Sequence, residues 1–223
     1  MTFTAKEKQV IRRCDTPDKI QRFLLSMPYF YGTKNERFRS FRTVIKEGTA
    51  DCVEGAITAA AIMSAHGHPP LVVDLRAKND WDHVIFIYRE NGKYGSIALS
   101  RDPNLYGRKP RFSTVGDLVM SYYYPYLSDG GWIDSFAVAN LDKSKIDWRF
   151  SRKDIFELED FLDNARHRRV KKDIEPAVVR KILQAYYIVK RWIKRRLLRK
   201  IYHSSSFKSG IFEKCFLFPV TRI

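Results

Sequence analysis

The stretch Gly48-Thr49-Ala50-Asp51-Cys52-Val53-Glu54-Gly55-Ala56 places a cysteine where a loop turns into an alanine-rich helix. The helical pattern starts at Thr49 or Asp51 and runs to about His66. Amide groups at a helix N-terminus carry partial positive charge, which favours a thiolate, whereas the carboxylate of Asp51 opposes one. Cys52 is therefore a candidate nucleophile. The alternative is a buried small apolar residue, as free cysteines often are.

Three short apolar segments follow this helix and predict β-strands at residues 71–75, 83–88 and 94–99. The Asn91-Gly92 pair between the last two is a strong signal for a tight hairpin, so those two strands are antiparallel neighbours. His83 opens the second strand. An imidazole in that place can take a thiol proton and later return it, so His83 is the candidate base for Cys52.

The hairpin also indicates which residue could orient the imidazole. With Asn91-Gly92 as a two-residue turn, His83 faces Ser100, and directly opposed residues have Cβ atoms roughly 4.5–5.5 Å apart. Asp102 is the nearest carboxylate on the same face, at the diagonal distance of roughly 7–8 Å. Ser100 and Asp102 are both candidates for the third catalytic residue. A serine hydroxyl stabilises an imidazolium much less than a carboxylate does.

The rest of the chain predicts further helices. One starts at Thr16-Pro17, one covers residues 114–124, and one covers residues 151–165, where Ser151 and Asp154 are typical of a capped start. Glu54 is expected to cap its own helix or to hold an arginine. The composition changes after about residue 143, so we expect a core at residues 1–150 and a helical extension at residues 151–223.

Most of the positive charge belongs to this extension. The chain has a formal net charge of +16, and residues 166–200 contain fourteen Lys and Arg against Asp173 and Glu175. Apolar residues recur at helical spacing from Glu175-Pro176 to about Tyr202. The segment is either a packed amphipathic helix with a solvated basic face or a binding surface for anionic lipid or nucleic acid.

Composition excludes several classes. The 44% hydrophobic content is typical of a folded globular protein. The cysteines Cys14, Cys52 and Cys215 are odd in number and form no CxxC pair, which argues against a zinc ribbon or a disulfide framework and favours a reducing compartment. No secretory leader or membrane span is visible. We expect a cytoplasmic protein, or one peripheral to the membrane, with no metal and no cofactor.

The residues from Thr16 to Tyr126 resemble the transglutaminase-like superfamily of cysteine enzymes, which is related in architecture to papain. The resemblance rests on a cysteine that opens a helix, a histidine that opens a strand, and a third residue on the next strand. The chain also shares short sequence motifs with a bacterial subgroup of uncharacterised transglutaminase-like proteins, which it resembles. These motifs are Cys52-Val53-Glu54-Gly55-Ala56, Gly67-His68-Pro69-Pro70-Leu71, Asp74-Leu75 and His83-Val84.

This resemblance implies an α+β fold in which the cysteine helix packs on an antiparallel sheet. It implies acyl transfer through a thioester, with Cys52 as nucleophile, His83 as base and an aspartate as third residue. Ser100 stands at the in-register position, with Asp102 just beyond. The chain is then expected to be a cysteine hydrolase or acyltransferase acting on a peptide or amide. The alternative is an inactive transglutaminase-like module that binds an anionic partner through residues 166–200.

Overall fold

The computed structural model describes residues 2–31, 37–128, 131–170 and Lys181. The chain divides into two compact units, Met1–Pro176 and Ala177–Ile223, and nearly all of the described residues belong to the first. The expected helix from residue 175 to about 202, and most of the basic segment 166–200, lie outside the described residues. Residues 151–170, which the sequence analysis assigns to the extension, belong to the first unit.

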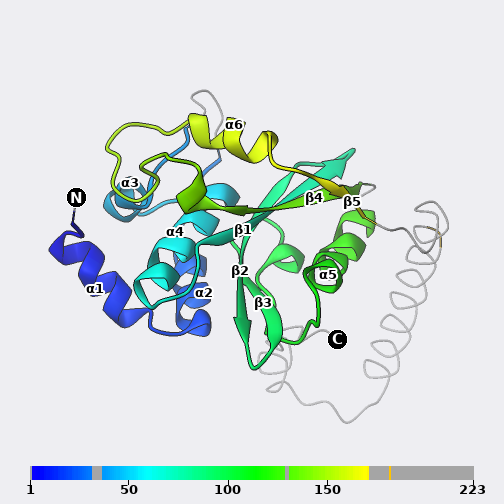
Figure 1. Ribbon diagram of the computed structural model, residues 1–223, viewed down its shortest axis with the longest axis horizontal. Helices are drawn as coiled ribbons and strands as arrows, with labels where there is room; N and C mark the ends of the chain where they lie inside the picture. Colours follow the sequence, from blue (N-terminus) through cyan, green and yellow to red (C-terminus); the bar gives the residue numbers. More distant parts are fainter. Residues whose placement is uncertain (1, 32–36, 129–130, 171–180, 182–223) are drawn as a thin grey trace, which may run out of the picture. The chain divides into compact units, whose positions relative to one another are not determined.

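The structure is a mixed α/β arrangement in which helices cover an antiparallel sheet (Figure 1). Its elements in chain order are α1 (Ala5–Arg13), α2 (Pro17–Leu25), α3 (Phe41–Glu47), α4 (Cys52–Ala65), β1 (Leu71–Lys78), β2 (His83–Glu90), β3 (Lys93–Ile97), η1 (Pro103–Leu105), α5 (Val115–Ser128), β4 (Trp132–Asn140), η2 (Leu141–Lys143), α6 (Glu157–Asp163) and β5 (Arg168–Arg169). Among the described residues, no helix combines the length and apolar character needed to cross a membrane.

The five strands lie in the order β3-β2-β1-β4-β5, and each neighbouring pair is antiparallel. The predicted hairpin is confirmed: Glu90 pairs with Lys93, and both turn residues have positive φ (48° at Asn91 and 76° at Gly92). The predicted register holds as far as the pair Phe86 and Ile97, where β3 ends. Strand β4 beside β1 was not predicted from the sequence.

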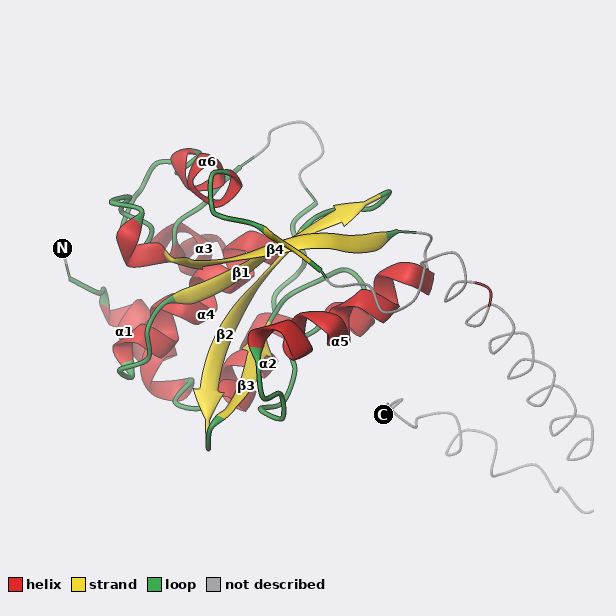
Figure 2. Ribbon diagram, turned by 45° about the vertical axis from the view of Figure 1, so that its right-hand side comes forward, coloured by secondary structure: helices red, strands yellow, loops and turns green. Residues whose placement is uncertain are grey.

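Both faces of the sheet are covered. Figures 1 and 2 show α4 on one side of the sheet and α5 on the other. Residues His83 to Tyr88 of β2 are all buried, as expected for a strand packed on both faces. Because side chains alternate along a strand, Val84 and Phe86 join the core with α4, whereas His83 points to the opposite face. There its ring centroid lies 6.1 Å from that of Tyr122 of α5.

Helix α4 begins and ends where the sequence predicts. Asp51 is its N-cap, and Asp51 and Glu54 form a reciprocal capping box. At the other end, Gly67 adopts a left-handed conformation with φ 87°, which stops the helix. All ten residues from Glu54 to Met63 are buried, so the helix lies inside the core. Cys52 therefore stands at a fixed position on its first turn.

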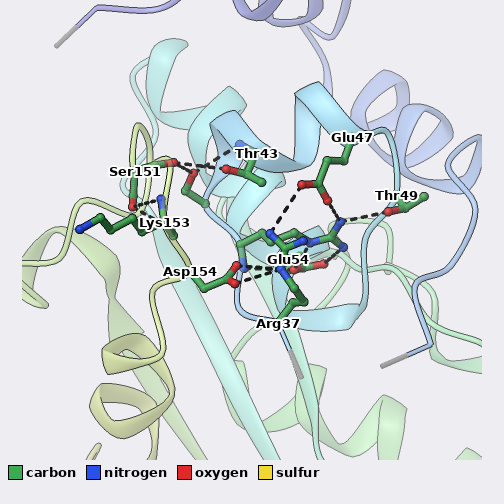
Figure 3. Close-up of polar contacts among 10 residues, drawn as sticks. Arg37, Thr43, Glu47, Thr49, Glu54, Ser151, Lys153 and Asp154 are labelled. Atoms are coloured by element: carbon green, nitrogen blue, oxygen red, sulfur yellow. Dashed lines mark hydrogen bonds and ion pairs between the residues drawn. The ribbon is translucent and has the colours of Figure 1, made fainter. Parts of the chain in front are cut away.

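The predicted helix at residues 151–165 is only partly present. The observed α6 is shorter, Glu157–Asp163, and its N-cap residue Phe156 makes no side-chain capping bond. Ser151 instead accepts from the N–H of Lys153 within a turn, and Asp154 binds Arg37 at 3.0 and 3.1 Å (Figure 3). Since these partners occupy the expected capping side chains, the helix starts after them.

Candidate active site

The four residues singled out from the sequence meet at one pocket. Its volume is about 300 Å³. Its lining comes from the chain between α2 and α3, the start of α4, the β1–β2 loop, the start of β2, the segment after β3 and the end of α5: Tyr29, Cys52, Asp80, Trp81, Asp82, His83, Ser100, Arg101, Asp102, Leu105, Pro125 and Tyr126. The fold thus brings the candidate nucleophile and the candidate base to the same cavity, although their side chains belong to a helix and a strand far apart in the chain.

Cys52 is half-buried and surrounded by hydrogen-bond donors. The backbone N–H groups of Val84 and Val53 and the hydroxyl of Tyr29 all act on its thiol and lower its pKa. Two larger effects oppose them. Burial, followed by the negative charge of Asp51, raises the pKa of Cys52 to about 12. The sequence did not indicate whether the helix end or Asp51 has the larger effect on the pKa of Cys52. In the structure, burial and Asp51 together have the larger effect, and the thiol is neutral at pH 7.

Tyr29 reaches the thiol because the chain before α3 runs beside the residues that lead into α4. Tyr29 forms a parallel bridge with Ala50, and the N–H of Phe30 donates to the Ala50 carbonyl at 2.9 Å. Burial, and next the neighbouring Cys52, raise the pKa of the Tyr29 phenol above its ordinary value. The phenol therefore stays protonated and is a hydrogen-bond donor to the sulfur of Cys52.

A buried ion pair fixes the start of α4. Arg39 and Glu54 are 1% and 0% exposed, and both carboxylate oxygens of Glu54 accept guanidinium N–H groups at 2.6 Å. Glu47 and Thr49 bind the remaining Arg39 nitrogen at 2.6 and 3.1 Å, and Figure 3 shows them converging with Glu54. Glu54 also accepts from the N–H of Asp51 at 3.1 Å. The prediction that Glu54 caps its helix or holds an arginine is confirmed in both forms.

Asp51 titrates in an unusual range for a carboxylic acid. Burial, and next the charge of Glu54, raise its pKa to about 7, although the N–H of Glu54 and the charge of Arg39 act in the other direction. The N-cap residue beside the candidate nucleophile therefore changes charge near neutral pH. Its ionisation makes thiolate formation at Cys52 harder.

His83 is 3% exposed, and its ring is held by a backbone group. Its Nε2 lies 3.1 Å from the carbonyl oxygen of Leu105. A carbonyl only accepts, so the contact requires the proton on Nε2 and leaves the lone pair on Nδ1. No group in the described part of the chain hydrogen-bonds Nδ1. Burial, opposed by the Leu105 bond and assisted by the charge of Arg108, lowers the pKa of His83 to about 4.

The Leu105 carbonyl is aimed at His83 by a small framework. Leu105 ends the short helix η1, whose first turn is capped by the carboxylate of Asp102 at 2.8 Å from the N–H of Asn104. Arg108 donates to the carbonyl of Asn104 at 2.6 Å and also to that of Tyr106. Arg108 therefore binds the carbonyls of Asn104 and Tyr106, on either side of Leu105 in the chain. The Leu105 carbonyl itself is left to accept from the imidazole of His83.

Ser100 and Asp102 both line the pocket, but neither makes a hydrogen bond to His83 within the described residues. The hydroxyl of Ser100 accepts from the N–H of Asp102 at 3.1 Å. Directly after β3, the side chain of Gln21 binds both backbone groups of Ala98, at 3.1 and 2.8 Å. The ladder that would have set His83 opposite Ser100 therefore does not continue. Asp102 acts on His83 only through its charge, which raises the pKa of the imidazole, and through η1.

Sequence analysis missed three parts of this site. The Leu105 carbonyl belongs to the backbone, so no side-chain pattern marks it. Tyr29 and Arg108 come from segments whose approach to the pocket depends on tertiary packing. Within the described ranges, no group of three or more His, Cys, Asp or Glu residues is arranged to hold a metal ion.

Comparison with models of protein families and with curated proteins gives no match for this chain. The pocket, the thiol and imidazole that line it, and the hydrogen-bond donors around them are therefore what indicates a function.

Proposed function

We propose that this protein is a transglutaminase-like cysteine hydrolase or acyltransferase that acts on an amide or peptide bond. The observation that carries the proposal is the convergence of Cys52, at the start of a buried helix, and His83, with its Nδ1 lone pair unengaged, on one pocket. A thiol and an imidazole that line one pocket are the components of nucleophilic catalysis by cysteine.

The first half of the reaction forms a thioester. The Nδ1 of His83 takes the proton of the Cys52 thiol as Sγ attacks the carbonyl carbon of the substrate. The tetrahedral intermediate collapses, the carbon–nitrogen bond breaks, and the leaving amine takes the proton from Nδ1. The Leu105 carbonyl keeps the imidazole in the same tautomer and orientation throughout.

The second half releases the acyl group. Water, for a hydrolase, or an amine, for a transferase, gives a proton to Nδ1 and attacks the thioester carbon. The carbon–sulfur bond then breaks, and Sγ recovers the proton from His83. Both groups return to their neutral starting forms, which are the forms favoured by a thiol pKa of about 12 and an imidazole pKa of about 4.

Stabilisation of the tetrahedral oxygen falls to donors next to Sγ. The backbone N–H of Cys52 is one, at the N-terminus of α4, where helix amides have no carbonyl partner within the helix. The Tyr29 hydroxyl, which already contacts the thiol, is the second. A neutral phenol beside the attacked carbon suits this role because it donates without titrating near pH 7.

The test is to trap the thioester. Incubation with the activated ester p-nitrophenyl acetate is expected to add one acetyl group to Cys52, removable by hydroxylamine and located by peptide mass spectrometry. Cys52→Ala is expected to lose this adduct. Cys14, 5% exposed in the hydrophobic core, serves as the internal control and is expected to stay unmodified. Acetylation of other residues with Cys52 untouched would refute the proposal.

An inactive binding module is the competing proposal. It is favoured by the large separation between the pKa values of Cys52 and His83, which keeps the resting pair neutral and the thiol weakly nucleophilic. The same trapping experiment decides between them, because an inactive module forms no thioester at Cys52. Binding of anionic lipid or nucleic acid through residues 166–200 stays a prediction.

A further inference from the structure

The rim of the pocket has the opposite charge to the rest of the chain. Three carboxylates, Asp80, Asp82 and Asp102, line it against one guanidinium, Arg101, although the whole chain carries +16. Asp80 and Asp82 are exposed, and neither forms an ion pair with any residue that the structure describes. Each accepts one backbone N–H, Asp80 from Trp81 at 2.8 Å and Asp82 from Ala77 at 2.7 Å, so a cationic ligand can still bind the exposed carboxylates.

Trp81 stands between the two exposed aspartates. It is 75% exposed, although a large aromatic side chain is usually buried when it only stabilises the fold. The loop that carries it is held in place. The hydroxyl of Tyr126 donates to the Trp81 carbonyl at 2.9 Å, and Asp82 accepts from the N–H of Ala77 at 2.7 Å. An exposed indole on a fixed loop offers a flat face for binding.

A second observation connects this rim to the chemistry inside. His83 is more than nine-tenths buried and lines the same pocket, and its Nδ1 has no hydrogen-bond partner among the described groups. Its Nε2 is bound by the Leu105 carbonyl, so Nδ1 is the imidazole nitrogen left for a ligand in the pocket. A molecule that contacts His83 and Cys52 in this pocket shares its lining with Trp81 and the two neighbouring aspartates.

We propose that the substrate of this site carries a positively charged side chain, of the lysine or arginine type, close to the carbonyl that Cys52 attacks. The cation lies against the face of Trp81, with Asp80 and Asp82 on either side. Cation–π attraction and two carboxylates that have no ion pair among the described residues act on the same group in this arrangement, and together they select a cationic substrate over an anionic one. This inference rests on the proposed function, because it places the cation relative to the reacting thiol.

The test uses two thiol reagents of opposite charge on the full chain. These are 2-(trimethylammonium)ethyl and 2-sulfonatoethyl methanethiosulfonate. With each, the Cys52 thiolate attacks the sulfenyl sulfur, a mixed disulfide forms, and methanesulfinate leaves. Rates at Cys52 are measured at pH 9 by peptide mass spectrometry and divided by the rate of each reagent with 2-mercaptoethanol. The normalised rate is expected to be at least about 10-fold higher for the cation in low salt.

Variants assign the preference to the rim. The double variant Asp80→Asn, Asp82→Asn is expected to lose most of the rate preference for the cationic reagent. High salt screens charge–charge attraction, so the preference that remains in high salt is assigned to the indole, and Trp81→Leu is expected to lose that remainder. Glu90→Gln removes an exposed carboxylate at the far end of β2 and is the matched control, expected to change nothing. Equal normalised rates, or a preference unchanged in the double variant, overturn the inference. That outcome leaves the thioester experiment unaffected, because disulfide formation needs no acyl chemistry.

Discussion

At the scale of single residues, a neutral thiol and a neutral imidazole line the same pocket. The pKa of Cys52 is raised chiefly by burial and that of His83 is lowered chiefly by burial, so neither group is charged at neutral pH. In the proposed reaction, proton transfer must then accompany attack on the substrate, and donors that stabilise negative charge on sulfur or on the substrate oxygen become important.

Tyr29 is the donor that can be removed with the least disturbance. We predict that Tyr29→Phe lowers the rate of Cys52 acetylation by p-nitrophenyl acetate by 10-fold or more, since loss of one oxyanion donor typically costs about 10²–10³ in rate. Alkylation by iodoacetamide forms no tetrahedral oxygen and is the control. The ratio of acetylation to alkylation rate is expected to fall. A ratio equal to that of the wild type contradicts an oxyanion role and leaves Tyr29 only a contact of the thiol.

At the scale of elements, the start of α4 depends on the buried pair of Arg39 and Glu54. Replacing Glu54 by Gln leaves a guanidinium that is 1% exposed facing a neutral amide. We predict a loss of about 3–5 kcal/mol in the free energy of unfolding, measured by urea denaturation, as is usual when one partner of a buried ion pair is removed. Glu47→Gln is the matched control, because Glu47 is 34% exposed and binds the same arginine, and about 1 kcal/mol or less is expected there. Equal losses would show that burial of the pair is not what stabilises this turn.

Gly55 sets the distance between α4 and the chain that follows β3. A Cβ built at Gly55 lies 2.8 Å from the Cβ of Leu99, closer than real side chains approach. We predict that Gly55→Ala lowers the free energy of unfolding by about 1–3 kcal/mol through overpacking. Gly116→Ala in α5 is the comparison, since its nearest contact is 3.6 Å and alanine favours a helix, by up to about 1 kcal/mol. A stabilising Gly55→Ala would mean that the two segments are not closely packed.

The helices and strands also show which features could be predicted from the sequence: those fixed by residues close together in the chain. The Asn91-Gly92 turn fixes the register of β2 and β3 because a two-residue turn leaves only one pairing. The start and end of α4 follow from Asp51 and Gly67 for similarly local reasons. The end of β3 could not be predicted, because it depends on Gln21, which lies 77 positions earlier in the chain. The true partner of His83 was missed for the same reason: tertiary packing delivers a backbone carbonyl there, whereas the pattern pointed to Ser100 and Asp102.

At the scale of the whole molecule, two groups that line or border the site, His83 and Asp51, change the free energy of unfolding in opposite directions as the pH rises. His83 has a pKa of about 4 against 6.5 for the ordinary side chain, so the unfolded chain binds more protons and stability rises from pH 4 to 6.5, by on the order of 3 kcal/mol. Asp51 has a pKa of about 7 against 3.8, so the folded chain binds more protons and stability falls over the same window. The two contributions oppose each other.

Removing one group therefore exposes the other. We predict that Asp51→Asn, which keeps a capping side chain, makes the free energy of unfolding rise more steeply between pH 4 and 6.5 than in the wild type. His83→Gln is expected to have the reverse effect, with stability falling more steeply up to pH 7. Urea denaturation at four pH values measures both slopes. Parallel pH profiles in all three proteins would contradict the assigned pKa directions.

The central claim is that His83 is the base for Cys52, and the rate of Cys52 acetylation as a function of pH tests it most directly. If His83 takes the thiol proton during attack, His83→Gln is expected to react about 10²-fold or more slowly than the wild type near pH 7, within the range usual for general-base catalysis. The two rates are expected to converge at high pH, where hydroxide removes the thiol proton. Circular dichroism checks that the variant is folded. Equal rates of Cys52 acetylation in the wild type and a folded His83→Gln variant at pH 7 would contradict the account.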